Sequence, residues 1–503
     1  MHRPRLKTLA FIFALALTLS PRAPAEAFVK GLVHNEEGFE GAVRVVEEAG
    51  DKNFGYVTVE IPYLDVHGNK KMGQGRLFLR KHEIASGKPI PIFCHVHYEK
   101  GVDGAKSWCK KGWAVATARY GKEGDGYPID VSVGDGYNLA RAVIEWALRL
   151  PFIDRTHLHI DGGSQGGYMA LAMSADFFPV AATTADFPVV NWAYNLNYFE
   201  ANKPVSKHPQ TDMKNSPLPI LCAVTGLANA SYEIFGNDLK SETWYRLSPI
   251  SYLDAITNPV LVTCATGDML VPMEQMTRKH LRPIDSSRFP EGYQRDFDSL
   301  TLCESARKTF EELLPPEKVC VHMQPLQKNS FEVTLAMFNK EQKKPAKRPK
   351  DMDRPWSKDH QWSLCYLDEG GPSPYASHTT YEWDVSPDSF VEAHRTQTPP
   401  PELLTTAKLE RLMQRYTGQM RDLPTLGDGR PANRLNYPDA EKRDVLAGLL
   451  DYADLGEAYA ARLQSIYHET ALKPFGDTLD VGALRNEYKR MTGSAQVSQE
   501  GTR

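Results

Sequence analysis

The chain has 503 residues and a net charge of −4 at pH 7, with 59 Lys and Arg against 63 Asp and Glu. Because both signs of charge are interspersed, the sequence offers no extended positive field for nucleic acid or for an anionic membrane surface, and we expect neither partner. Seven cysteines are few for this length and odd in number, which argues against a disulfide scaffold.

The N-terminus has the parts of a secretory signal peptide. Basic residues precede an apolar run at residues 8–19, and the small residues Ala25 and Ala27 fit a cleavage site. The run is shorter than the roughly 20 residues that a membrane-spanning helix needs. We therefore expect residues 1–27 to be removed and the mature protein to act in the periplasm or outside the cell, without a stable membrane anchor.

The next segment predicts a sheet with antiparallel leading strands. Residues 56–61 and 75–79 alternate between apolar and polar side chains, which is typical of half-buried strands. Apolar runs at residues 91–94 and 113–118 then alternate with helical patterns. Such alternation predicts βαβ units and a parallel sheet with helices packed on it.

The clearest helical pattern precedes a strand and a glycine-rich turn. Apolar residues at helical spacing form one stripe, which Pro151 follows: Leu139, Ala142, Val143, Trp146 and Leu150. The strand at residues 157–160 leads directly into Gly-Gly-Ser-Gln-Gly-Gly and then into helix-forming residues. Strand, tight turn and helix are predicted in that order.

The turn around Ser164 matches the G-x-S-x-G nucleophile elbow of serine hydrolases. Gly162, Gly163 and Gly166 would permit a sharp turn that projects the hydroxyl above the sheet. A glycine turn that merely contains a serine is the alternative. The strand before and the helix after favour the nucleophile.

The elbow and a second motif carry a resemblance to a known group. The form G-G-S-Q-G-G and the element S-P-I-S-Y at residues 248–252 resemble the prolyl oligopeptidase-like and acetyl xylan esterase-like branches of the α/β-hydrolase superfamily, over about residues 89–276. The resemblance implies an α/β-hydrolase fold, with a mostly parallel sheet, antiparallel leading strands and helices on both faces. It also implies a serine hydrolase.

Asp268 is the candidate acid of the triad. It follows an apolar run at residues 260–265, and a carboxylate at the carboxyl end of a parallel strand faces the same crevice as the elbow. It would accept the imidazole N–H and stabilise the imidazolium. A turn aspartate that caps the next helix is the alternative.

The base must be a histidine that follows Asp268. His378 lies in a loop after a plausible last strand at residues 362–367, so it is our choice, although its separation from Asp268 is longer than usual in the resembled group. His322, in an apolar run, is the second candidate. Other histidines also qualify by order: His280, His360, His394 and His468.

Gln165 and Tyr98 are the candidate oxyanion donors. The N–H of the residue after the nucleophile is one donor, and the loop after an early strand supplies the other. In the resembled families that loop carries His-Gly-Gly or a tyrosine, so Tyr98 would donate through its N–H or its hydroxyl. His95 and His97, two apart on the expected strand, suggest a zinc pair only weakly, because further ligands at suitable spacing are missing; we expect neither metal nor cofactor.

Three further segments complete the expected organisation. Residues 191–248 are rich in aromatic side chains and form either a cap over the site or part of the core. Residues 340–358 are basic and proline-containing, as in a solvated loop. The catalytic domain is expected over residues 28–395, followed by a helical extension over 396–503, with helices within residues 402–415, 442–472 and 481–491.

The residues together predict a secreted serine hydrolase that cleaves a small-molecule ester, or a short peptide, through an acyl-enzyme. A carboxylesterase is favoured over a prolyl oligopeptidase-like peptidase, because the gating propeller of full-length prolyl oligopeptidases has no room before the first strands. A catalytically inactive binding protein of the same fold is the third possibility. The substrate group and the oligomeric state are not readable from these patterns.

Overall fold

The computed structural model describes most of the chain from residue 43 onward. The described residues are 43–97, 99–119, 133–202, 228–265, 270–277, 319–325, 362–368, 387–395, 398–420 and 423–493, with the single residues 268, 308 and 314. The expected signal peptide and basic loop lie outside them, as do Tyr98 and His378.

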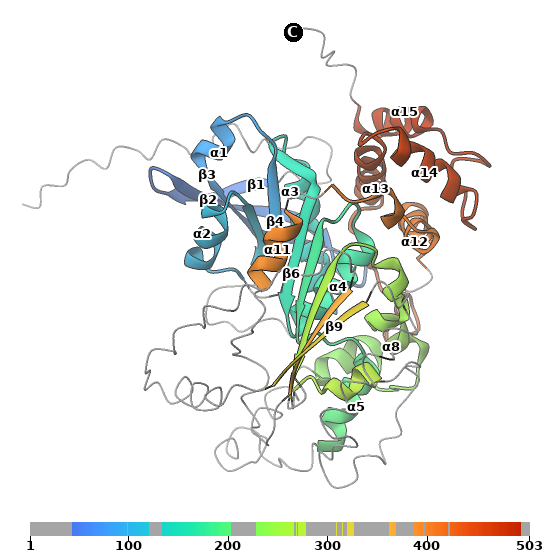
Figure 1. Cartoon of the computed structure of the whole chain (residues 1–503). Helices are drawn as coiled ribbons and strands as arrows, with labels where there is room; N and C mark the ends of the chain where they lie inside the picture. The colour runs from blue at the N-terminus through green and yellow to red at the C-terminus, as the bar shows by residue number, and fades with distance from the viewer. Residues whose placement is uncertain are drawn as a thin grey trace, which may run out of the picture.

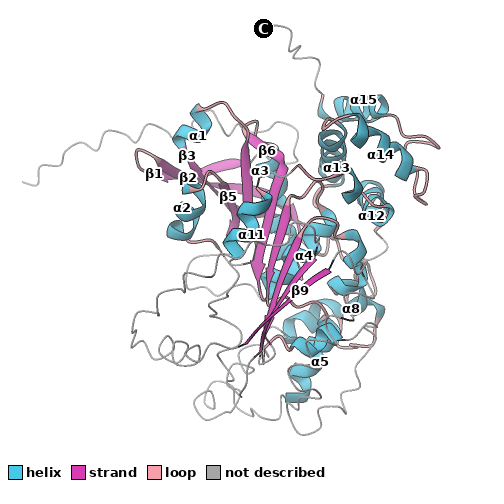
Figure 2. Cartoon of the chain, in the orientation of Figure 1, coloured by secondary structure: helices cyan, strands magenta, loops and turns pink. Residues whose placement is uncertain are grey.

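Within these residues, ten strands form one sheet, flanked by helices on both faces (Figures 1 and 2). The spatial order is β1-β2-β3-β5-β4-β6-β7-β8-β10-β9. The pairs from β1 to β5 are antiparallel and the later pairs are parallel, which confirms the predicted α/β fold with antiparallel leading strands. The strands are β1 (Arg44–Gly50), β2 (Phe54–Leu64), β3 (Lys70–Arg80), β4 (Ile90–His95), β5 (Ala114–Arg119), β6 (Ile153–Gly163), β7 (Ala182–Asp186), β8 (Val260–Ala265), β9 (Val319–Pro325) and β10 (Trp362–Asp368).

The described helices cover the sheet and form a separate C-terminal group (Figure 1). On the sheet and the segments after it lie α1 (Lys81–Ala85), α2 (Val102–Lys110), α3 (Asp135–Leu148), α4 (Gln165–Asp176), α5 (Trp192–Asn202), α8 (Glu242–Leu247), α11 (Pro387–His394) and the 3₁₀ turns Pro249–Ala255 and Met273–Thr277. The C-terminal group comprises the 3₁₀ turn Pro401–Leu403, α12 (Thr406–Thr417), α13 (Pro438–Ala453), α14 (Glu457–Tyr467) and α15 (Val481–Thr492).

Strand alternation divides the apolar side chains between two cores. Leu77 and Leu79 of β3 pack in the core that contains α3 and α4, whereas Phe78 between them packs in the other core. Successive side chains of a strand point to opposite faces, so the two cores are the two faces of the sheet. The second core holds side chains of α2 and α11, which places these helices on the face opposite α3 and α4.

The far edge of the sheet departs from chain order. β10 pairs in parallel with β8, residue Trp362 opposite Val260, and β9 pairs with the outer side of β10. The run at residues 362–367 is therefore a strand, as predicted, and no later strand occurs in the part of the chain that the structure describes. The spatial edge, however, is occupied by β9, which contains His322.

The aromatic residues of segment 191–248 that the structure describes are largely core. Five of them are buried in the main core: Trp192, Tyr194, Tyr198, Phe235 and Trp244. The core interpretation therefore holds for these side chains, while residues 203–227 lie outside the described part. Cys94 and Cys264 are buried and, within the described part of the chain, not in a disulfide, as expected.

The C-terminal residues are helical, with one break that the sequence pattern did not show. The run at residues 442–472 is two helices, α13 and α14, because Gly456 has φ 145°, a backbone conformation that residues with a Cβ rarely adopt. These helices bury a core of their own, and α12 and α13 pack against α4 and β6. Among the described residues, no helix has the length and apolarity needed to cross a bilayer.

Candidate active site

Ser164 lies at a strained junction between β6 and α4. Its backbone has φ 57° and ψ −117°, a conformation that residues other than glycine seldom adopt. The Ser164 N–H donates to the Asp186 carbonyl oxygen at 2.7 Å, and the Tyr168 N–H donates to the Ser164 carbonyl oxygen at 3.2 Å. Such strain persists only where the surrounding structure holds it, and it gathers at functional sites.

Two of the three predicted elbow glycines are required by close backbone contacts. A Cβ on Gly162 would lie 2.3 Å from the Gly166 carbonyl oxygen, and a Cβ on Gly166 would lie 2.7 Å from the Val96 carbonyl oxygen. Gly163 is different, because its nearest neighbour would be an ordinary 3.7 Å away. Gly163 therefore has room for a Cβ, and close backbone contacts do not require a glycine there. Gly167 is the further glycine without room, since its Cβ would approach Pro188 at 2.9 Å.

The loop after β4 lies against the first turn of α4. A Cβ on Gly166 would be 3.0 Å from the His97 Cβ, so the backbone around His97 touches the elbow. Gln165, whose N–H is one predicted oxyanion donor, begins α4 at this contact. Tyr98, the second predicted donor, follows His97 and lies outside the described residues.

His95 and His97 do not share a strand face, contrary to the sequence expectation. β4 ends at His95, and His97 has φ 74°, which breaks the alternation of the strand. Among the residues that the structure describes, no group of three or more His, Cys, Asp or Glu side chains is arranged to hold a metal ion.

Asp268 follows the carboxyl end of β8, and Ser164 follows the carboxyl end of β6, so the two residues lie at the same end of these parallel strands. Its side chain is buried, and its Oδ1 accepts hydrogen bonds from the Leu270 N–H at 2.8 Å and the Val271 N–H at 3.0 Å. One carboxylate oxygen thus caps the next turn, which is the alternative role considered for this residue. These bonds also fix the orientation of the carboxylate, as a triad acid requires.

The two candidate bases occupy different places. His322 lies inside β9, which β10 separates from the strand of Asp268. His378 lies outside the described residues, in the connection between β10 and α11. That connection leaves the sheet at Asp368, the carboxyl end of the strand beside β8, and returns at α11. On the face that α11 covers, the Trp113 indole N–H donates to Glu392 at 3.0 Å.

A His–Asp pair beside the elbow was missed by the sequence analysis. His95 Nδ1 lies 2.5 Å from Asp161 Oδ2, and the register of β4 against β6 places these two residues opposite one another. Asp161 lies three residues before Ser164 in β6. Burial alone would raise the pKa of Asp161, but the hydrogen bond and charge of His95, with Lys100 at 4.0 Å, hold it well below its usual range. Thr184 also donates to this carboxylate.

Asp186 is a second missed residue, at the carboxyl end of β7 between the strands of Ser164 and Asp268. Its carbonyl oxygen holds the Ser164 N–H, and its side chain accepts a hydrogen bond from Thr263 at 2.8 Å. Burial, followed by the negative charge of Asp161, raises the pKa of Asp186 to about 6. The signal in the sequence was only that Asp186 ends an apolar run, which by itself is not informative.

Replacing Asp186 with asparagine is expected to stabilise the protein at neutral and alkaline pH. With a folded pKa of about 6 and an ordinary unfolded value, the wild-type fold binds the extra proton at mildly acidic pH, so its stability falls as pH rises from about 4 to 6 and stays lowered above that range. Asparagine removes this cost. Urea unfolding at pH 8 should show a gain of about 2–3 kcal/mol, which shrinks towards pH 4.

The matched control for this prediction is Asp254→Asn, which changes an exposed carboxylate. That variant should change the free energy of unfolding by less than about 0.5 kcal/mol at either pH. An Asp186→Asn variant whose stability difference from wild type is the same at pH 4 and pH 8 would contradict the raised pKa.

Comparisons with known proteins give structural likenesses at low identity. No protein-family model and no curated protein matches the sequence. The acylaminoacyl peptidase of Pyrococcus horikoshii is 16% identical over 47% of this chain and 42% of its own length, with a TM-score of 0.32. Acetyl xylan esterase 1 of a Thermoanaerobacterium species is 13% identical over 46% of this chain and 74% of its own length, with a TM-score of 0.30. This chain thus spans less than half of the first protein.

The fold itself follows from the sheet and the elbow described above. A mostly parallel sheet carries a strained serine between a strand and a helix, a buried aspartate follows a strand two positions along the sheet, and helices cover both faces. These features together define the α/β-hydrolase fold. The chain has the α/β-hydrolase fold, with a group of C-terminal helices packed beside the helix that follows Ser164.

Proposed function

We propose that the protein is a serine hydrolase that cleaves carboxylic esters through an acyl-enzyme, with Ser164 as the nucleophile. The observation that carries the proposal is the positive φ of Ser164, held by its bond to Asp186 and by glycines without room for a Cβ. A turn that only contained a serine would have no need of this strain. An elbow of this kind presents the hydroxyl at the rim of the sheet, where a carbonyl carbon can be attacked.

Asp268 and His378 complete the proposed triad. The buried, hydrogen-bonded carboxylate of Asp268 would orient the imidazole and stabilise its charged form, and His378 would take the Ser164 proton and deliver it to the leaving group. The strand order supports His378, because the strand before it, β10, lies directly beside the strand of Asp268.

Two donors would stabilise the oxyanion. The N–H of Gln165 is at the start of α4, where the helix dipole also favours negative charge. Tyr98 follows the loop residue His97, whose Cβ position is in contact with the elbow. Acyl transfer by these groups needs no cofactor.

We propose a small-molecule ester as the substrate and export of the protein by residues 1–27. An ester already carries a competent leaving group, whereas an amide nitrogen must be protonated as it departs. A short peptide is the alternative substrate. It would be favoured if amides of short peptides were cleaved at least as fast as aryl or acetyl esters under the same conditions.

The proposal is tested by active-site labelling. We expect one equivalent of a fluorophosphonate probe to react with the wild-type protein, and Ser164→Ala to remove both the labelling and the hydrolysis of an aryl acetate. Ser174→Ala is a suitable control, because Ser174 is buried in the same helix and its hydroxyl donates to the Ala170 carbonyl at 2.7 Å. Labelling that persists in Ser164→Ala would show that the nucleophile is another residue.

A further inference from the structure

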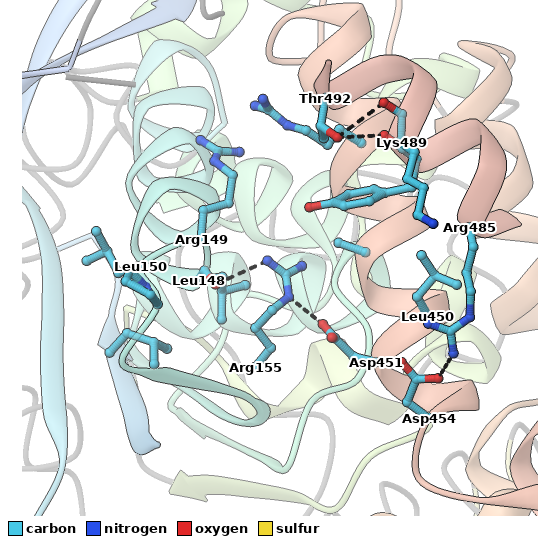
Figure 3. A pocket seen from close by; sticks show the side chains of 15 residues that line it. Leu148, Arg149, Leu150, Arg155, Leu450, Asp451, Asp454, Arg485, Lys489 and Thr492 are labelled. Carbon is cyan, nitrogen blue, oxygen red and sulfur yellow. Dashed lines mark hydrogen bonds and ion pairs between the residues drawn. The ribbon is translucent and has the colours of Figure 1, made fainter. Parts of the chain in front are cut away.

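A pocket of about 660 Å³ lies where the C-terminal helices meet the sheet domain (Figure 3). One wall is formed by the end of α3, the turn after it and the start of β6, and the other by α13 and α15. β6 begins at this pocket and ends at the elbow, so the two sites are separated by the length of an eleven-residue strand, about 30 Å. The pocket is therefore distinct from the proposed active site.

Positive charge predominates in the pocket. Five cationic side chains line it against two carboxylates, and the cations stand on both walls: Arg149, Arg155, Arg443, Arg485 and Lys489. Figure 3 shows Arg149 and Arg155 on one side and Arg485 and Lys489 on the other. A cleft with one predominant sign of charge on low-dielectric walls focuses the field onto a ligand of the opposite sign.

Several of these cations are fixed in place by carboxylates behind or beside the pocket. Arg149 Nη1 donates to both carboxylate oxygens of Asp444, at 2.9 and 3.2 Å. The side chains of Arg149 and Asp444 are almost fully buried. Arg155 binds Asp451 and the Leu148 carbonyl oxygen at 3.1 Å. Arginines held in this way are oriented before a ligand arrives, so little conformational entropy is lost on binding.

Lys489 contributes charge that is not neutralised locally. Among the described residues, no ion pair or hydrogen bond engages its ammonium group, whereas Arg485 on the preceding turn of α15 pairs with Asp454. The ammonium thus adds to a lining in which Arg149 and Arg155 are already balanced by Asp444 and Asp451. An anion that enters the pocket would meet this unpaired charge first.

Part of the remaining lining is apolar. Leu148, Leu150 and Ile153 come from the sheet domain, and Ala447 and Leu450 come from α13. A volume of this size accommodates a small organic molecule, and mixed apolar and charged walls select one with both characters. A planar guanidinium matches the geometry of a carboxylate in particular.

We propose that this pocket binds a small organic carboxylate with an aromatic or aliphatic body. The carboxylate lies between Lys489 and the arginines, and the apolar body rests on the leucines of α3 and α13. The site joins the hydrolase sheet to the C-terminal helices, so an occupied pocket ties the two together. The proposal does not depend on Ser164 being catalytic, because no residue that lines the pocket lies at the end of the sheet where Ser164 is found.

Binding is tested by calorimetry on the full-length protein with benzoate, benzamide and inorganic phosphate as probes. We expect saturable binding of benzoate with a Kd on the order of 0.1–1 mM at low salt, weakening as ionic strength rises. Benzamide, which has the same ring without the charge, and phosphate, which has charge without the ring, should each bind at least about tenfold more weakly.

Two variants on the same helix localise the effect. Lys489→Glu should weaken benzoate binding by at least about tenfold, whereas Arg490→Glu, the same charge change one residue further on and outside the pocket lining, should leave it within about twofold. Circular dichroism will show whether both variants remain folded. Binding in the proposed active site would be indifferent to Lys489→Glu. Equal effects of the two variants, equal binding of benzamide, equal binding of phosphate, or no saturable binding of benzoate would each overturn the proposal.

Discussion

Replacing His378 with alanine is expected to lower kcat for an aryl acetate by about 10⁴ or more, with the fold intact. Without a base, the Ser164 hydroxyl stays protonated at neutral pH and the leaving group receives no proton. Because a triad acts as a unit, the loss should approach that of Ser164→Ala, and the double variant should be no slower than either single one. Steady-state rates, with circular dichroism and thermal melts as the check on folding, measure the effect.

His322→Ala is the matched control. His322 sits within β9, which is separated from the strand of Asp268 by β10, so its replacement should change kcat by less than about tenfold. The reverse result, with His322 essential and His378 dispensable, would show that the base comes from the outer strand. If neither were essential, His95 would be the histidine to test next, because it already holds a carboxylate beside the elbow.

The parts of the site that the sequence predicts are those set by local order along the chain. A strand, a glycine turn and a helix around Ser164 are all local features, and their spacing alone placed the elbow correctly on β6 and α4. Asp268 was chosen for the same reason, since an apolar run with an aspartate shortly after its end predicts a carboxylate at the carboxyl end of a parallel strand, and its role as the acid stays a prediction.

The parts that the sequence did not predict depend on which strands pair. His95 and Asp161 are 66 positions apart, and only the register of β4 against β6 brings them to 2.5 Å. The position of β9 outside β10 has the same origin, because chain order does not say which strand occupies an edge. Gly163 occupies a variable position of the G-x-S-x-G pattern, and the backbone has room for a side chain there.

The contact between the C-terminal helices and the sheet domain was also invisible in the sequence. Four charged side chains, which composition alone would place at the surface, are almost completely buried between α3, α12 and α13: Arg141, Glu145, Arg415 and Glu441. A further cation, Lys408 of α12, is buried at the end of α4 and donates to the carbonyl oxygens of Ser174 and Phe177 at 2.6 Å. A cation at a helix C-terminus is favoured by the helix dipole, so the C-terminal helices support the helix that begins at the elbow.

Replacing Arg415 with methionine is expected to lower the free energy of unfolding by about 3–5 kcal/mol. Arg415 forms ion pairs with Glu145 of α3 and Glu441 of α13, and its Nη1 donates to the Asp176 carbonyl oxygen at 3.1 Å. Methionine fills a similar volume but leaves the carboxylates of Glu145 and Glu441 without this partner. A buried charge without its partner destabilises the fold by more than the intact ion pair stabilised it, so the expected loss of stability is large. Urea unfolding at pH 8 measures it.

The pH dependence of this loss distinguishes ionised partners from simple loss of packing. Burial, with the nearby charges of Glu441 and Asp444, already raises the pKa of Glu145 to about 8. Removing Arg415 raises it further, so the variant's fold keeps this proton to a higher pH than the wild-type fold does. The stability lost relative to wild type should therefore grow as pH rises above about 8. Arg490→Met, which breaks an exposed pair with Glu487, should leave the free energy of unfolding almost unchanged at any pH. An Arg415→Met loss that is the same at pH 7 and pH 10 would mean that Arg415 does not stabilise an ionised Glu145, and the junction would then be held by apolar packing and neutral hydrogen bonds.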